Sequence, residues 1–169
     1  MIKSILCVDN KYGIGKKNDL LFHLPVDMKY FRETTRGHVV FMGENTLLSF
    51  PGSKPLPKRI NVVLSQDVTH NYEGVENVHT FDEFLKKMKE YSLKDDVFVV
   101  GGASIYRQTL PYVDEVLLTK VNKDGGAEVF FANLDEHPDF VLVDPGEPIM
   151  DGEYEIRFTK YFNKNKKEI

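Results

Sequence analysis

The chain alternates uninterrupted apolar segments with segments of helical periodicity over about its first 120 residues, and this alternation is the strongest limit on its fold. Residues 2–8, 38–43 and 97–101 are apolar almost throughout, as expected of strands buried on both faces. Helical patterns over residues 25–36 and 81–91 lie between such strands. Because parallel strands need crossover connections, which are usually helices, this order predicts a parallel sheet covered on both faces.

The last part of the chain follows another pattern, since strands follow strands there without helices between them. Residues 154–162 alternate apolar side chains, such as Ile156 and Phe158, with polar ones, which is typical of a half-exposed antiparallel strand. The sequence therefore predicts a three-layer α/β fold with a mostly parallel central sheet, helices on both faces and antiparallel C-terminal edge strands. We expect one domain over residues 1–162 and a frayed tail over residues 163–169.

Composition and charge exclude several classes of function. A chain of 169 residues, 41% hydrophobic and 28% charged, can bury a core without covalent cross-links. The net charge of −4 argues against a nucleic-acid partner, and no apolar run approaches the roughly 20 residues of a membrane helix. A single cysteine excludes an intramolecular disulfide, and five scattered histidines give no metal-ligand spacing. We expect a cytoplasmic monomer that binds no metal.

One acidic residue stands out by its position. Pro25 predicts the start of a helix, and Asp27 in the first turn lies beside an apolar stripe that contains Met28 and Phe31. Exposed N–H groups and the helix dipole favour acids in first turns, and this explanation needs no function. The alternative is a carboxylate in a partly apolar pocket, tuned to bind or protonate a ligand. A dyad with His23 is a weaker candidate, because no serine or cysteine nucleophile lies beside it.

Two strands end in glycine and lead directly into a helical segment. Gly43 lies between VVFM and ENTLL, and the pair Gly101–Gly102 lies between VFVV and ASIY. Glycine lets the backbone approach a ligand closely, and helix N-termini attract anions. Neither segment is a dinucleotide fingerprint or a P-loop, so a tight turn is the other explanation of each. Two such turns at one edge of a sheet favour a phosphate-bearing ligand.

Six motifs in the right order and spacing resemble the dihydrofolate reductase family over residues 2–162. They are GIGKKN, LPVDMKYF, VVFMG with a following threonine, KPLPKR with VVLS, VVGGASIY and LLTKV. The resemblance implies an oxidoreductase that reduces 7,8-dihydrofolate to 5,6,7,8-tetrahydrofolate for one-carbon metabolism. It implies hydride transfer to pterin C6 with protonation at N5, NADPH as the cofactor and NADH as the alternative cofactor.

The resemblance also implies roles for particular residues at the substrate. Asp27 is expected to accept paired hydrogen bonds from the pterin ring N–H and the 2-amino group. Thr119 matches a threonine that hydrogen-bonds this acid, Tyr106 is the third residue expected at the catalytic centre, and Arg59 is expected to bind the α-carboxylate of the substrate's glutamate. The other residues expected at the substrate are Ile5, Leu6, Phe22, Met28, Phe31, Phe50, Leu56 and Val100.

For the cofactor, the resemblance implies a lid and a phosphate cradle. The first loop, residues 9–19, is expected to cover the nicotinamide, and the peptide bond between Gly101 and Gly102 is expected to be cis. The residues expected around the cofactor are Cys7, Ile14, Gly15, Asn18, Leu20, Gly43, Glu44, Asn45, Thr46, Leu64, Ser65, Gln66, Gly101, Gly102, Ala103, Ser104, Ile105 and Tyr106.

The chain departs from the family pattern in three places. Leu21-Phe22 stands where Pro-Trp is usual, and phenylalanine cannot donate the hydrogen bond of an indole N–H. Glu44-Asn45 replaces a basic pair and Gln66 replaces a residue that is often basic, near the expected 2′-phosphate. We therefore expect a weaker preference for NADPH over NADH than the family norm, with NADPH still favoured.

Two other classes of function compete with this interpretation. A related reductase that acts on a pyrimidine or sugar-linked intermediate would not need Asp27, Phe31 and Arg59 together. A nucleotide-binding module without catalysis would not need Asp27. Oxidation of NADPH in the presence of dihydrofolate distinguishes the three.

Overall fold

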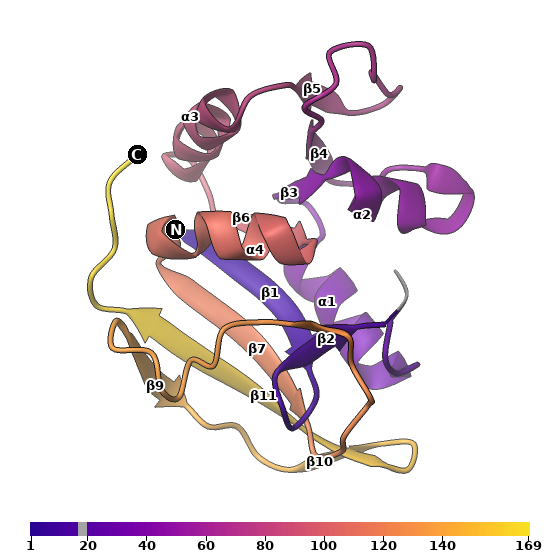
Figure 1. The fold of residues 1–169 in the computed structure, drawn as a ribbon, viewed down its shortest axis with the longest axis vertical. Helices are drawn as coiled ribbons and strands as arrows, with labels where there is room; N and C mark the ends of the chain where they lie inside the picture. The colour runs from indigo at the N-terminus through magenta and orange to yellow at the C-terminus, as the bar shows by residue number, and fades with distance from the viewer. Residues whose placement is uncertain (17–19) are drawn as a thin grey trace.

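The computed structural model describes residues 1–16 and 20–169 (Figure 1). Within them, the main sheet has the strand order β10–β11–β7–β1–β6–β3–β4–β5, with β9 also paired to β11. Its strands are β1 (Ile2–Val8), β3 (Val39–Gly43), β4 (Ile60–Leu64), β5 (Glu76–Val78), β6 (Val97–Gly101), β7 (Glu115–Val121), β9 (Phe140–Asp144), β10 (Ile149–Asp151) and β11 (Tyr154–Asn163). A second sheet pairs β2 (Gly13–Gly15) with β8 (Val129–Phe130).

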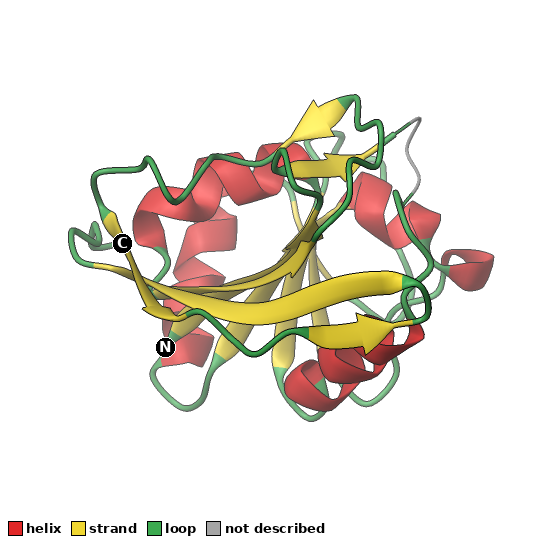
Figure 2. Ribbon diagram, turned by 90° about the horizontal axis from the view of Figure 1, so that it is seen from below, coloured by secondary structure: helices red, strands yellow, loops and turns green. Residues whose placement is uncertain are grey.

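The helices lie on both sides of the main sheet (Figure 2). They are α1 (Pro25–Thr35), α2 (Glu44–Ser49), α3 (Phe81–Ser92) and α4 (Ala103–Thr109), with short 3-10 helices η1 (Pro51–Ser53) and η2 (Leu110–Tyr112). Strands β7, β1, β6, β3, β4 and β5 are parallel, and β11 pairs antiparallel with β7, β9 and β10. The predicted three-layer α/β architecture is confirmed.

Neighbouring residues of one strand serve the two faces of the sheet. Phe41 of β3 packs with Phe84 and Met88 of α3 in the larger core cluster. Val40, next to it, belongs to the cluster on the other face, together with Leu47 of α2. Because successive strand side chains point to opposite faces, a continuous apolar strand is what a sheet covered on both sides requires.

The polar–apolar alternation of β11 describes only part of that strand. Ile156 is fully buried, and the ring of Phe158 lies 4.2 Å from that of Tyr30 on α1. From Thr159 onward the other face is buried, and Tyr161 is 1% exposed within the larger cluster. Helix α1 covers only the first half of β11, so the strand changes its buried face along its length.

Two segments differ from the sequence expectation. The first loop contains β2, which pairs with β8 and is too short for a recognisable pattern. The tail expected to fray lies against the body: the Lys167 N–H donates to the Pro111 carbonyl, and Ile169 packs on the larger cluster. Among the described residues, no helix is long and apolar enough to cross a membrane.

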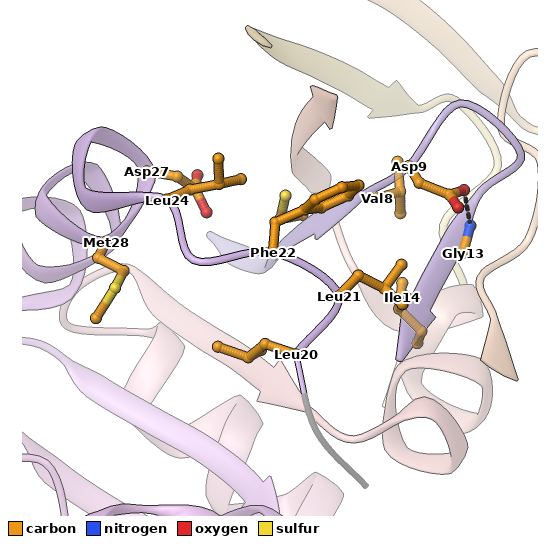
Figure 3. A pocket seen from close by; sticks show the side chains of 11 residues that line it. Val8, Asp9, Gly13, Ile14, Leu20, Leu21, Phe22, Leu24, Asp27 and Met28 are labelled. Carbon is orange, nitrogen blue, oxygen red and sulfur yellow. Dashed lines mark hydrogen bonds between the residues drawn. The ribbon is translucent and has the colours of Figure 1, made fainter. Parts of the chain in front are cut away.

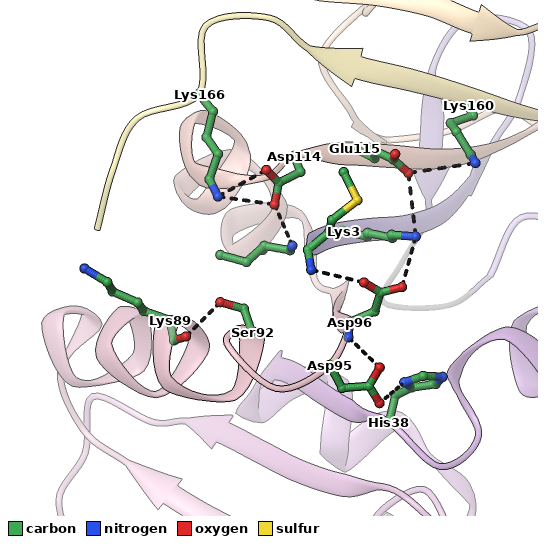
Figure 4. Close-up of polar contacts among 12 residues, drawn as sticks. Lys3, His38, Lys89, Ser92, Asp95, Asp96, Asp114, Glu115, Lys160 and Lys166 are labelled. Carbon is green, nitrogen blue, oxygen red and sulfur yellow. Dashed lines mark hydrogen bonds and ion pairs between the residues drawn. The ribbon is translucent and has the colours of Figure 1, made fainter.

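Ion pairs hold the edge of the sheet at which the parallel strands begin (Figure 4). The α-amino group of Met1 lies 3.0 Å from Asp96. The ammonium of Lys3 lies 3.2 Å from Asp96 and 3.7 Å from Glu115. The predicted site residues lie at the opposite side of the sheet, where the parallel strands end.

Candidate active site

A pocket opens beside the end of β1, between the first loop and α1 (Figure 3). Asp27 and Met28 lie at one end of it, and Asp9, Gly13 and Ile14 lie at the other. The residues that line the pocket are Cys7, Val8, Asp9, Gly13, Ile14, Leu20, Leu21, Phe22, Leu24, Asp27 and Met28. The structure thus brings together the predicted site residues Cys7, Ile14, Leu20, Phe22, Asp27 and Met28.

Asp27 is held by a partner from the sheet. Thr119 of β7 stands opposite Cys7 of β1, is 2% exposed, and donates from Oγ1 to Asp27 Oδ1 at 2.7 Å. Burial raises the pKa of the Asp27 carboxyl, the Thr119 hydrogen bond opposes this shift, and the charge of Asp151 adds to it. A first-turn acid that only served the helix dipole would not need a buried hydroxyl aimed at it.

The apolar stripe of α1 is only partly buried. Leu24 is 3% exposed, whereas Met28 is 46% exposed and Phe31 is half-buried. An apolar surface left open beside a pocket is suited to a ligand with an apolar ring system.

A second set of predicted residues surrounds the cluster on the α1 face. Phe31, Phe50, Leu56 and Val100 pack, partly buried, around a group that includes Ile5. The side chain of Leu6 belongs instead to the larger cluster on the other face, so only its backbone can face this site.

Tyr106 connects helix α4 to β1. It is 7% exposed, and its O–H donates to the Ile5 carbonyl at 2.8 Å. Burial raises the pKa of its phenol. Tyr106 therefore acts here as a neutral hydrogen-bond donor.

Neutral oxygen atoms hold the guanidinium of Arg59. Its Nη1 donates to Thr35 Oγ1 and its Nε to the Pro57 carbonyl, both at 2.9 Å. No carboxylate of the described residues pairs with it. Burial lowers the pKa of the guanidinium, and the charges of Arg32 and Arg36 lower it further. An anion that arrived there would relieve this repulsion.

The two glycine turns meet at one place. A Cβ added to Gly101, where φ is 129°, would lie 3.2 Å from Thr46 Oγ1. A Cβ added to Gly43 would lie 3.1 Å from the Ile105 side chain. The peptide bond between Gly101 and Gly102 is cis, as expected. Ala103, Ser104 and Ile105 follow as the first turn of α4, and Leu64 and Ser65 lie buried at the neighbouring strand end.

Glu44 is not a free side chain. Its Oε2 accepts from the Tyr72 hydroxyl at 2.5 Å and lies 2.9 Å from His70 Nδ1, and the Tyr72 hydrogen bond is the main cause of its lowered pKa. Asn45 and Gln66 are exposed nearby. Sequence reasoning missed Tyr72 and His70, because the irregular loop that carries them has no periodicity to place it. Asn18 lies outside the described residues.

Asp9, which sequence reasoning also missed, joins two loops. It is 2% exposed. Its Oδ1 accepts from the N–H groups of Lys11 at 2.8 Å and Gly13 at 2.7 Å, and its Oδ2 accepts from the N–H of Gly125 at 2.9 Å. A Cβ added to Gly125 would lie 2.9 Å from the Phe22 ring and 3.0 Å from the Leu21 side chain, so only glycine fits against them. An aspartate directly after a strand and before a glycine turn is the sequence signal that could have found it.

Comparisons with known proteins agree with this arrangement. The family model described as dihydrofolate reductase matches residues 1–163. A dihydrofolate reductase of Bacillus subtilis is 33% identical over 167 residues, covering 98% of this chain and 96% of that protein. One of Staphylococcus haemolyticus is 31% identical over 162 residues, covering 95% and 94%. The solved structure of the dihydrofolate reductase from Enterococcus faecalis, complexed with NADP(H) and RAB-propyl, matches with a TM-score of 0.85 and 27% identity over 96% of each chain.

Fold, site and relatives together define an oxidoreductase of small molecules. More narrowly, the chain belongs to the dihydrofolate reductase family, because the family model spans nearly its whole length.

Proposed function

We propose that this chain reduces 7,8-dihydrofolate to 5,6,7,8-tetrahydrofolate with NADPH as reductant, a product that would supply one-carbon metabolism. A hydride is added at pterin C6 and a proton at N5. The observation that carries the proposal is the half-buried Asp27 carboxyl, hydrogen-bonded by Thr119 at 2.7 Å in a largely apolar pocket. We also propose that residues 1–162 form one domain, which the family match over residues 1–163 supports.

Asp27 would bind the substrate and hold the proton. Two parallel hydrogen bonds to a carboxylate are strong and directional, so the ring N–H and 2-amino group of a pterin suit this residue. Burial raises the pKa of Asp27, so the carboxyl keeps a proton at a higher pH than an exposed aspartate does. Thr119 fixes the rotamer of the acid by donating to Oδ1.

The rest of the substrate has matching surfaces. The rings of Phe31 and Phe50 and the side chain of Leu56 offer an apolar wall for the aminobenzoyl group. Arg59, which lacks a counter-ion among the described residues, would bind the α-carboxylate of the glutamate. Backbone carbonyls of Ile5 and Val100 would accept from the pterin amino group. The Ile5 carbonyl also accepts from the Tyr106 hydroxyl at 2.8 Å, and a carbonyl oxygen has two lone pairs.

The residues at the strand ends fit a dinucleotide phosphate. Gly43, Gly101 and Gly102 form a cradle that a Cβ would fill, beside the Thr46 hydroxyl. Thr46 and the first turn of α4 would hold the pyrophosphate, and Cys7, Ile14 and Tyr106 would surround the nicotinamide. When bound, NADPH supplies the hydride. The residues of this chain would align the two rings, and Leu20 and Phe22, which line the pocket, would shield the rings from water once both ligands are bound.

Spectrophotometric oxidation of NADPH with dihydrofolate tests the proposal. Wild type should oxidise NADPH only when dihydrofolate is present. Asp27→Asn should keep the fold and lose roughly 10²- to 10⁴-fold in rate at neutral pH, because both the charge and the proton are lost. Asp82→Asn, the same change in the exposed first turn of α3, is the matched control and should be neutral.

Two results would count against the proposal. If the wild-type protein is inactive with dihydrofolate, the remaining interpretations are a nucleotide-binding module without catalysis and a reductase of another substrate. Full turnover in Asp27→Asn would remove Asp27 from the catalytic centre.

A further inference from the structure

Helix α1 begins without a capping side chain of its own. Its N-cap residue is Leu24, which has no side-chain acceptor, and Pro25 has no N–H to donate. The first backbone hydrogen bond runs from the Met28 N–H to the Leu24 carbonyl. The N–H of Asp27 therefore has no acceptor within the helix. It donates instead to Asp151 Oδ2, at 3.1 Å.

The backbone of a tight hairpin fixes Asp151. It is the last residue of β10 and pairs with Tyr154 of β11 across a two-residue turn. Gly152 in that turn has a φ of 62°, as such turns require. The side chain of Asp151 is 2% exposed. A buried carboxylate held on a hairpin is a rigid support, unlike a long side chain on a loop.

We propose that Asp151 is a positioning residue for Asp27, because it caps the first turn of α1 from the β10–β11 hairpin and so fixes where the catalytic carboxyl stands. Its carboxylate also places a like charge near Asp27. This inference rests on the proposed function, because it concerns how Asp27 binds the pterin and holds its proton. The charge and the hydrogen bond are separable, since an asparagine keeps the acceptor and removes the charge.

Among the described residues, no cation forms an ion pair with Asp27 or Asp151. The titratable groups on the neighbouring elements are Asp9 and Cys7 at the end of β1, Tyr30 on α1, Tyr106 on α4 and Tyr154 on β11. Burial raises the pKa of the Cys7 thiol and of the Tyr106 phenol, so both stay uncharged at neutral pH. After burial itself, Asp151 is the influence that raises the pKa of Asp27.

Single-turnover rates of NADPH oxidation by the holoenzyme with dihydrofolate, measured against pH, test the inference. The rate should fall as Asp27 loses its proton at rising pH. In Asp151→Asn this fall should move to lower pH by roughly 0.5 to 1 unit, because a like charge has been removed. Glu153→Gln removes a charge from the exposed turn two residues away and should leave the profile unchanged. Asp151→Ala, which also loses the acceptor, should in addition raise KM for dihydrofolate.

Asp27→Asn in the same assay separates the two claims. It should abolish the pH-dependent fall, and if the fall persists unchanged, the proposed function of Asp27 is overturned. If Asp27→Asn abolishes the fall while Asp151→Asn leaves it at the wild-type pH, only the role of Asp151 is overturned. Asp151→Ser, a shorter uncharged acceptor, takes the place of the asparagine variant if that variant does not fold. An unchanged profile there overturns the inference equally.

Discussion

Two charged residues of the site differ in what already holds them. Arg59 donates to neutral oxygens of Thr35 and Pro57, so its charge is open to a ligand. Glu44 accepts from Tyr72 and lies against His70, so its carboxylate is kept where it points. We therefore expect Arg59, which no carboxylate of the described residues neutralises, to attract an incoming anion. We expect Glu44, whose partners keep it in place, to repel one.

Removing Arg59 should weaken only ligands that carry a carboxylate tail. In Arg59→Ala, dihydrofolate should lose about 1.5–3 kcal/mol of binding free energy, the usual value of a charge-assisted hydrogen-bonded pair. A pterin without the glutamate should bind as it does to wild type. Titration of both ligands by calorimetry measures the difference, and equal losses would contradict the role of Arg59.

Glu44 should weaken discrimination between the two cofactors. At an effective dielectric of about 20, like charges ~6 Å apart repel by a few kcal/mol, and screening leaves ~1 kcal/mol near a surface. Glu44→Arg should therefore raise the ratio of kcat/KM for NADPH to that for NADH. Glu73→Arg makes the same charge change on an exposed loop residue and should leave the ratio alone. The same ratio in wild type and Glu44→Arg would mean that Glu44 has no part in cofactor choice.

At the scale of elements, helix starts show how local and distant caps differ. Thr80 caps α3 from within the sequence, because its Oγ1 accepts from the Glu83 N–H at 3.2 Å. Helix α1 takes its acceptor from a strand 124 residues away. The first kind of cap is visible in a sequence and the second is not.

Loss of the local cap should cost stability without touching the site. Thr80→Ala should lower the free energy of unfolding by about 1 kcal/mol, measured by urea denaturation. Ser92→Ala at the other end of α3 should cost much less, because alanine is the better helix former there. Equal losses in the two variants would argue against a specific capping role.

The elements found correctly from the sequence are those whose signal is local. Pro25 and the buried strands set their own boundaries through backbone restriction and apolar runs. Strands β2 and β10 have three residues each, too few for an alternation to stand out. The contacts of Asp9, Tyr72 and Asp151 depend on chain segments that only tertiary structure brings together. The resemblance to a family supplied site residues that spacing alone left open.

At the scale of the whole molecule, ionisation of Asp27 lowers the free energy of unfolding. The pKa of Asp27 is raised in the folded state, so over the interval between its unfolded and folded values the native state binds more protons. Stability from this group is therefore lost as pH rises through that interval. Whenever Asp27 is ionised, its partly buried carboxylate lowers the stability of the fold.

Asp27→Asn should consequently be more stable than wild type at neutral pH, while it loses activity. The gain should shrink as pH falls below the ordinary pKa of an aspartate, where both proteins carry a neutral group. Urea denaturation at neutral and acidic pH measures both points. A variant less stable than wild type at neutral pH would contradict this balance.

The carboxylate of Asp9 bears on how the pocket opens. It serves backbone donors of the first loop and of the loop that contains Gly125, 116 residues further along. If either loop moved away alone, a buried negative charge would lose donors that water could not quickly replace. Residues 9–13 and the loop around Gly125 should therefore behave as one cooperative unit. The waiting time for a ligand to enter or leave would then be set partly by the loop around Gly125, a residue that is not among those lining the pocket.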